Sequence, residues 1–218
     1  MVEMIQLKDR EEWLQYRGHT IGGSDASAIL GLNPWMSNAD LYRIKTGEKE
    51  QEDISDKPVV KFGIEAEALM RELFRLDYPE LKVFYKENNL WKNSDYPFAH
   101  ASLDGWLEDQ DGRKGIWECK TVNIQNGQQT EKWKDAIPDY YYTQLLHYFM
   151  VTGFDFAILK ARLRWEKHDD REVYAQIKHY RIERPEVEED LQILIEAEKE
   201  FYNRLETSKK PDLILPEI

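Results

Sequence analysis

The segment "GIWECKTV", residues 115–122, places two opposite charges inside an apolar strand pattern, which restricts the folds open to this chain. Alternate side chains of a strand share a face. Glu118 and Lys120 are therefore expected on one face, with Trp117 and Cys119 packed on the other. Burying an isolated charge is costly, so both charged groups need a partner or a cleft. A structural salt bridge at a strand end is one interpretation, and a functional cleft is the other.

The expected order of elements indicates a mixed α/β fold in which a central sheet is flanked by helices. Caps, turn residues and apolar spacing predict helices near residues 9–16, 24–31, 38–47, 58–74, 140–152 and 185–207. Strands are expected within 82–91, 97–109, 113–122, 154–165 and 171–182, with a hairpin turn at 109–115. We interpret residues 1–218 as one domain, made of an N-terminal helical region (1–57), a core (58–182) and an acidic C-terminal helix and tail (183–218).

The composition is that of a globular chain, with 41% hydrophobic and 33% charged residues among 218. We expect no membrane span, because no stretch has the apolar length to cross a bilayer, and no signal peptide. Cys119 is the only cysteine, which excludes an internal disulfide and a cysteine-rich zinc site. These features predict a cytoplasmic location.

The net charge of −12 argues against non-specific coating of DNA. Half of this excess lies in residues 183–218, which hold 11 acidic and 5 basic residues. Carboxylates that bind metal ions also count as negative, although bound cations would offset them. The charge therefore leaves room for a nucleic-acid protein with a local basic entrance.

Asp104, in "HASLDGWL", precedes Gly105 at an expected strand-to-turn boundary. An ordinary turn aspartate is one interpretation. The alternative is that Asp104 lies beside Glu118 and Lys120 of the next strand, which would bring two carboxylates and a lysine together. Such a set suits Mg²⁺, which binds a few carboxylates plus waters and phosphates. It also suits phosphodiester hydrolysis by metal-activated water.

This pattern resembles the PD-(D/E)xK nuclease core, in which an Asp is followed by Glu-x-Lys on the adjacent strand. The segment "RGHTIGGSDASAILGLNPWMSNADLYRIKTG", residues 17–47, is similar to the opening motif of the YqaJ-type viral recombinases, relatives of phage lambda exonuclease. The resemblance continues, in the family's order, through "FGIEAEALM", "ASLDGWLED", "GIWECKT" and "YYYTQLLHYFMVTG". It runs through most of the first 153 residues and is weakest after them.

The resemblance implies roles for residues of the core. Asp104 and Glu118 would bind Mg²⁺, helped by the backbone carbonyl of Cys119, and Lys120 would orient or activate the attacking water. Glu65 matches the family's helical glutamate, near a second metal ion. It lies between Phe62 and Leu69, two of the residues that we expect on the buried side of the 58–74 helix; a solvated glutamate is the alternative. Gln144 matches the glutamine of the last motif helix, aimed at the active centre.

A second implied site receives a terminal 5′ phosphate through Arg17 and Ser24. Physical chemistry agrees, because Ser24 lies at a helix start, where free N–H groups attract anions, and arginine presents a planar fork to phosphate oxygens. Alternatively, Ser24 only caps a helix and Arg17 makes a surface pair. Ser102 is a candidate contact to a DNA phosphate, or a satisfied turn serine. For His147 a packed histidine is favoured.

The activity implied by the resemblance is a Mg²⁺-dependent 5′→3′ exonuclease that acts on double-stranded DNA ends in phage-type recombination. Two ions per active site are implied, with Mn²⁺ as an alternative metal. A ring-shaped homotrimer, a single-strand annealing protein as partner and a phage or prophage origin are further implications. The alternatives are an endonuclease or RecB-like nuclease module of the same fold, and a catalytically silent DNA- or protein-binding domain.

Overall fold

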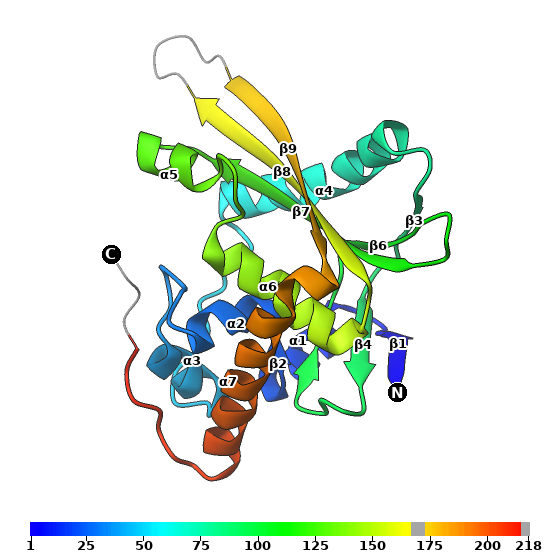
Figure 1. Ribbon diagram of the computed structural model, residues 1–218. Helices are drawn as coiled ribbons and strands as arrows, with labels where there is room; N and C mark the ends of the chain where they lie inside the picture. Colours follow the sequence, from blue (N-terminus) through cyan, green and yellow to red (C-terminus); the bar gives the residue numbers. More distant parts are fainter. Residues whose placement is uncertain (167–172, 215–218) are drawn as a thin grey trace.

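The computed structural model describes residues 1–166 and 173–214 (Figure 1). Its helices are α1 (Arg10–His19), α2 (Gly23–Ile29), α3 (Asn38–Lys45), α4 (Pro58–Asp77), α5 (Gly127–Lys132), α6 (Asp139–Thr152) and α7 (Glu188–Glu206), with a 3-10 turn at Arg184–Val187. Its strands are β1 (Val2–Gln6), β2 (Ile21–Gly22), β3 (Lys82–Phe84), β4 (Asn89–Asn93), β5 (Ala99–His100), β6 (Gly105–Glu108), β7 (Lys114–Asn123), β8 (Phe156–Glu166) and β9 (Val173–Glu183). No helix within the described ranges combines the length and apolar character needed to cross a membrane.

The main sheet has five strands in the order β3-β6-β7-β8-β9. Strands β7 and β8 run parallel, and the other neighbours run antiparallel, so the sheet is mixed. Helix α4 packs on one face with Trp117 and Ile158. Helices α6 and α7 cover the other face, where Ile116 and Leu159 lie (Figure 1). The predicted fold class, a central mixed sheet flanked by helices, is confirmed.

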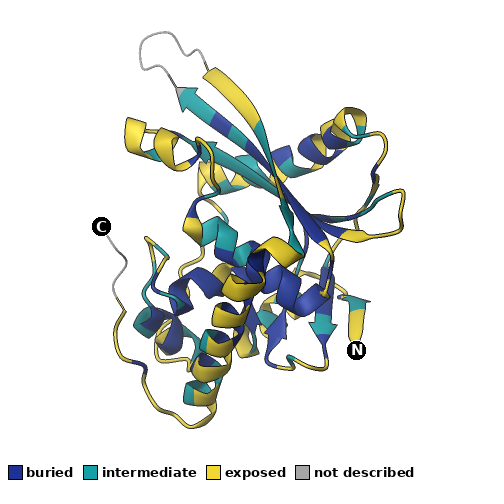
Figure 2. Ribbon diagram, in the orientation of Figure 1, coloured by how far each residue is buried: buried dark blue, intermediate teal, exposed yellow. Residues whose placement is uncertain are grey.

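Helix α6 forms the interior layer of the larger core, and most of its length is buried (Figure 2). It starts at Asp139, with Pro138 in the N-cap position, and ends at Gly153 in the left-handed conformation, φ 66°. Helix α7 buries only one side of its surface, including Leu191, Leu194 and Phe201. The expected helices over 140–152 and 185–207 are therefore confirmed.

The buried face of α4 differs in part from the expected one, which was the row of Phe62, Ala66, Leu69, Leu73 and Phe74. Ala66 and Phe74 are buried as expected, but Leu69 is 73% exposed and Met70 is buried instead. Apolar residues surround much of this helix, so the sequence permits more than one phase for its buried side. Contact with Trp117 in the sheet selects the row at i, i+4 and i+8. This shift changes which glutamate of α4 faces the interior.

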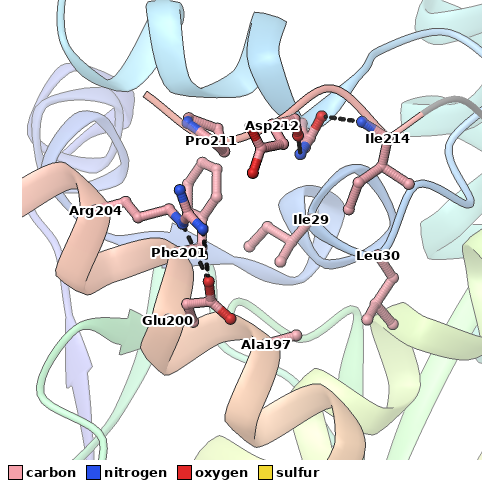
Figure 3. Close-up of a pocket in the computed structure, with 10 residues that line it drawn as sticks. Ile29, Leu30, Ala197, Glu200, Phe201, Arg204, Pro211, Asp212 and Ile214 are labelled. Carbon is pink, nitrogen blue, oxygen red and sulfur yellow. Dashed lines mark hydrogen bonds and ion pairs between the residues drawn. The ribbon is translucent and has the colours of Figure 1, made fainter. Parts of the chain in front are cut away.

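A pocket of about 260 Å³ lies where the C-terminal segment crosses α2 and α7 (Figure 3). Asn38 holds this segment at two points, donating to the Asp212 carbonyl at 2.7 Å and accepting from the Ile214 N–H at 3.0 Å. Ile29, Phe201 and Ile214 are among its apolar lining residues. None of the predicted site residues lines this pocket, so we assign it a packing role.

The packed histidine expected at position 147 is confirmed, and it joins α6 to α7. His147 is fully buried; its Nε2 donates to the His100 carbonyl at 2.8 Å, and its Nδ1 lies 2.7 Å from Glu198 Oε1. Because a carbonyl only accepts, Nε2 carries a proton. If Nδ1 also donates to Glu198, both ring nitrogens are protonated and the side chain is a charged imidazolium. Burial lowers the pKa of His147, but Glu198, the His100 carbonyl and Asp25 outweigh it, so the net shift is upward.

Replacing Glu198 with glutamine is expected to destabilise the protein by about 2 kcal/mol at pH 6, because a hydrogen bond between charged groups is lost. Folding raises the pKa of this histidine above its value in the unfolded chain, near 6.5. Its contribution to the free energy of unfolding is therefore complete below pH 6.5 and is lost as the pH rises through the pKa of the folded state. The deficit of Glu198→Gln should therefore shrink toward pH 9, as measured by urea unfolding across this range. Glu196→Gln, on the exposed side of α7, is the control. A deficit that grows with pH would contradict the assignment.

Candidate active site

The site forms where β7 continues beyond its pairing with β6. The last paired residues are Gly105 and Trp117, so the next N–H on that edge of β7 needs another partner. Asp104 supplies it, because its Oδ2 accepts from the Cys119 N–H at 2.9 Å. The side chain of Asp104 thus takes the place of a strand carbonyl. Arg71 of α4 donates to the Asp104 carbonyl and fixes the same turn. The expected closeness of Asp104 to the Glu118 segment is confirmed.

Glu118 and Lys120 form an ion pair, with Lys120 Nζ 2.5 Å from Glu118 Oε1. The Glu118 side chain is only 2% exposed and that of Lys120 20%. The second carboxylate oxygen of Glu118, Oε2, is buried and has no hydrogen-bond partner among the described residues. Leaving a buried oxygen without a hydrogen bond lowers the stability of the folded protein by roughly 1–3 kcal/mol. The salt bridge is therefore real but incomplete, since it leaves one charged oxygen available to a ligand.

On α4, Glu67 adjoins this group of residues, and the predicted Glu65 does not. Successive helical residues turn by about 100°, so Glu65 points away from the face that carries Ala66 and Met70. Glu65 is exposed, whereas Glu67 is half-buried and accepts from Arg71 Nη1 at 2.9 Å. Glu67 also interacts electrostatically with Asp104, Glu118 and Lys120. The structure therefore places Glu67, two residues after Glu65, beside the carboxylate group.

Burial raises the pKa of each carboxyl in this group, and a neighbouring carboxylate adds to the shift for Glu118 and Glu67. Burial first, and then Asp104, raise the pKa of Glu118 to about 8 against the pull of Lys120. Burial and Asp104 raise the pKa of Glu67 to about 7. Burial also raises the pKa of Asp104. For Lys120, Glu118 and Asp104 outweigh desolvation, and its pKa moves upward. Carboxyl groups with raised pKa values are what a cation would stabilise as anions.

The donor set fits a hard divalent cation that keeps much of its own hydration. Asp104 and Glu118 offer carboxylate oxygens, one of them the orphan Oε2. Within residues 1–166 and 173–214, no three His, Cys, Asp or Glu side chains are grouped closely enough to hold an ion by themselves. Mg²⁺ is commonly bound by one or two carboxylates plus waters and substrate phosphates. The residues present thus fit such an ion better than one that needs a complete protein cage.

Tyrosines of α6 close the site on the side facing Lys120. Gln144 Nε2 lies 2.6 Å from the Tyr148 hydroxyl, and this is where the predicted Gln144 makes its contact. The ring of Tyr141 lies 5.3 Å from Lys120 Nζ. Burial and then Glu118 raise the pKa of Tyr148 well above its usual value, so its hydroxyl stays a neutral donor. The sequence analysis missed both tyrosines, although their spacing from Gln144 puts all three on neighbouring helical positions.

Arg17 and Ser24 come together as predicted, with Arg17 Nη2 2.6 Å from Ser24 Oγ. The guanidinium carbon of Arg17 also lies 5.1 Å from the centre of the Trp13 ring. Trp13 donates through Nε1 to Ser102 Oγ at 2.8 Å and so joins the three residues, a link absent from the sequence prediction. Ser24 does not cap α2, because Gly22 holds the N-cap position.

This second group of residues adjoins the carboxylates. A cleft of about 350 Å³ is lined by Trp13, Ser102, Asp104 and Glu67, among others. A side chain on Gly23 would put its Cβ 2.6 Å from the Tyr148 ring, so α2 starts in close contact with α6. The Arg17–Ser24 group is therefore linked, through Trp13 and Ser102, to the cleft that Asp104 and Glu67 also line.

Comparison with known proteins shows the family. Residues 12–155 match the YqaJ-like viral recombinase domain, and the chain belongs to that family. It is 32% identical over 195 residues to the uncharacterized protein YqaJ of Bacillus subtilis (strain 168). That match covers 89% of this chain and 56% of the relative, so the chain spans little more than half of the length of YqaJ.

Solved structures confirm the fold. The alkaline exonuclease LHK-Exo of Laribacter hongkongensis superposes with a TM-score of 0.59 and 18% identity, covering 91% of this chain and 96% of that one. The complex of LHK-Exo with dAMP gives a TM-score of 0.55 and 20% identity, covering 91% and 98%. A phage-related exonuclease of Haemophilus somnus 129PT gives 0.53 and 16%, covering 87% and 96%. At these identities the likeness establishes the shared fold.

Proposed function

We propose that the chain is a metal-dependent deoxyribonuclease, a 5′→3′ exonuclease that degrades one strand of linear duplex DNA from its ends. The observation that carries the proposal is the buried Glu118 carboxylate: one oxygen accepts from Lys120, and the other has no hydrogen-bond partner among the described residues. Asp104 lies near enough to raise the pKa of Glu118. Membership in the viral recombinase family and the exonuclease fold support the same conclusion. A purely structural ion pair would need neither Asp104 nor the unpaired oxygen.

Asp104 and Glu118, with the carbonyl of Cys119, would hold Mg²⁺ or Mn²⁺, and Glu67 replaces Glu65 as the residue near a second ion. The ion would supply a water of lowered pKa and neutralise charge on the phosphate. Lys120 remains protonated because its pKa is raised, and it is held by Glu118 where it can donate to a water or phosphate oxygen. Gln144 and Tyr148 would orient groups around Lys120.

Arg17, with Ser24 and Ser102, would receive a terminal 5′ phosphate. The arginine offers its planar fork, and its guanidinium lies over Trp13, which lines the cleft that contains Asp104. A bound terminal phosphate would set the distance to the scissile bond, so that cleavage proceeds from an end. This recognition distinguishes an exonuclease from an endonuclease or RecB-like module of the same fold.

The family also suggests the biological setting, which we carry into the proposal. The protein would resect DNA in phage-type recombination within a bacterial host cytoplasm and hand a 3′ strand to a single-strand annealing protein. A homotrimeric ring threaded by DNA would explain how a chain of net charge −12 stays on its substrate, because topology replaces electrostatic attraction.

Digestion of linear duplexes labelled at either end, carrying 5′ phosphate or 5′ hydroxyl, tests the proposal beside a circular control. Loss from phosphorylated 5′ ends is expected with Mg²⁺ and should stop with EDTA, while the circle stays intact. Arg17→Ala should reduce the preference for 5′ phosphate by about 10-fold or more, because a charge-assisted contact is lost. Cleavage of the circle would favour the endonuclease alternative. A protein that leaves every duplex intact with Mg²⁺ or Mn²⁺ would favour the silent binding domain.

A further inference from the structure

Helix α1 carries Trp13 and Arg17 to the proposed phosphate pocket, yet none of its ten residues is buried. Apolar packing, which anchors most helices, therefore contributes little to its position. Its C-terminal end also lacks a glycine cap, because Thr20 follows in an extended conformation. The last carbonyls of a helix need partners from elsewhere. The position of Arg17 thus depends on the groups that donate hydrogen bonds to the last carbonyls of α1.

Lys45, the last residue of α3, supplies that anchor. Its Nζ donates to the carbonyls of Arg17 at 2.9 Å and Thr20 at 2.8 Å. It also lies 2.8 Å from Asp25 Oδ2, so each of its three N–H groups has an acceptor. The Lys45 side chain is 6% exposed and that of Asp25 5%. One buried ammonium therefore joins the end of α1 to α2.

Asp25 holds the start of α2 at the same time. Its Oδ2 accepts from the Gly22 N–H at 3.0 Å, one residue before the helix begins. Ser24, the neighbour of Asp25, is exposed and faces Arg17. Burial acts to raise the pKa of Asp25, but Lys45, Arg17 and the Gly22 N–H outweigh it and the pKa is lowered. The buried carboxylate therefore keeps its charge.

We propose that the buried Asp25–Lys45 pair is a positioning device that sets the Arg17 guanidinium against Ser24 and so determines the preference for 5′-phosphorylated ends. The inference rests on the proposed function, because it assumes that Arg17 and Ser24 bind the terminal phosphate. A buried ion pair is a poor source of stability compared with apolar residues of the same size. Its contacts are instead made to the backbone of the two segments that carry Arg17 and Ser24. The pair therefore acts through Arg17 and has no contact with substrate.

Asp25→Asn and Lys45→Met test this role through the ratio of kcat/KM for 5′-phosphorylated and 5′-hydroxyl duplexes. The ratio is expected to fall by about 10-fold or more in both, because a small misplacement of a binding group costs up to about 100-fold. Activity on hydroxyl ends should change little. Competition by inorganic phosphate should weaken in parallel. Lys61→Met, which breaks the exposed pair with Asp56, is the matched control and should leave the ratio unchanged.

Arg17→Ala and the Arg17→Ala/Asp25→Asn double variant complete the experiment. If Asp25 acts through Arg17, the double variant should be no worse on phosphorylated ends than Arg17→Ala alone. Multiplied losses, or an unchanged end preference in a folded Asp25→Asn, would overturn the inference while leaving the exonuclease function intact. A wild type indifferent to the end group would overturn 5′-phosphate recognition, and with it this role. Asparagine keeps the shape and the acceptor for Gly22, so Asp25→Asn decides the outcome if Lys45→Met does not fold.

Discussion

Lys120→Met is expected to reduce DNA cleavage by about 1,000-fold while leaving duplex binding measurable. The ammonium is the one cation bonded to Glu118 among the described residues, and in the proposed function it would contact a water or phosphate oxygen. Removing a single preorganised donor from an active site typically costs about 100- to 1,000-fold. Loss of the charge also removes a group that lowers the pKa of Glu118, which is about 8 even with Lys120 present, so the anionic form that a metal ion needs becomes still less favourable. Both effects lower the rate of cleavage.

The measurement is the initial rate of strand loss from a labelled linear duplex with Mg²⁺, together with the Kd for the same duplex in Ca²⁺. Lys82→Met is a matched control, because Lys82 also lies 2.5 Å from a glutamate, Glu108, across neighbouring strands, but with its side chain 69% exposed. The control should retain wild-type activity. Lys120→Met with more than a tenth of the wild-type rate would show that the lysine is structural.

The alternation of a strand made the faces of β7 predictable from sequence. Trp117 is fully buried with α4, and Glu118 and Lys120 lie on the opposite face, as a period of two requires. The closeness of Asp104 was predictable for a related reason, since it is the residue directly before β6 and β6 pairs with β7. The geometry of two neighbouring strands was therefore enough to predict that Asp104 lies beside the segment of Glu118 and Lys120.

Contacts between distant segments could not be predicted in this way. Trp13 reaches Ser102 across 89 positions, and Lys45 reaches the carbonyl of Arg17 across 28. Backbone carbonyls leave no trace in the sequence, so the anchoring of α1 is visible only in the folded chain. In α4, the burial of Ala66 and Phe74 was predicted, but Leu69 was expected inside and is exposed. Apolar residues surround much of this helix, and only contact with the sheet selects the side that is buried.

The choice between Glu65 and Glu67 has a direct consequence, since the two residues lie two positions apart on α4. Glu67→Gln is expected to lower the cleavage rate by about 10- to 100-fold, the usual cost of removing a group that supports a metal centre.

Stability should respond differently from activity. Glutamine keeps an acceptor oxygen for Arg71 and removes the repulsion between Glu67 and Asp104, so the Tm of Glu67→Gln should not fall. Glu65→Gln, on the exposed side of the same helix, is the matched control and should leave both rate and Tm unchanged. Thermal unfolding and single-turnover cleavage at saturating Mg²⁺ measure the two quantities on the same preparations. If Glu65→Gln lost activity while Glu67→Gln kept it, the prediction would be wrong. The side of α4 that carries Glu65, and not the side that carries Glu67, would then face the active site and DNA.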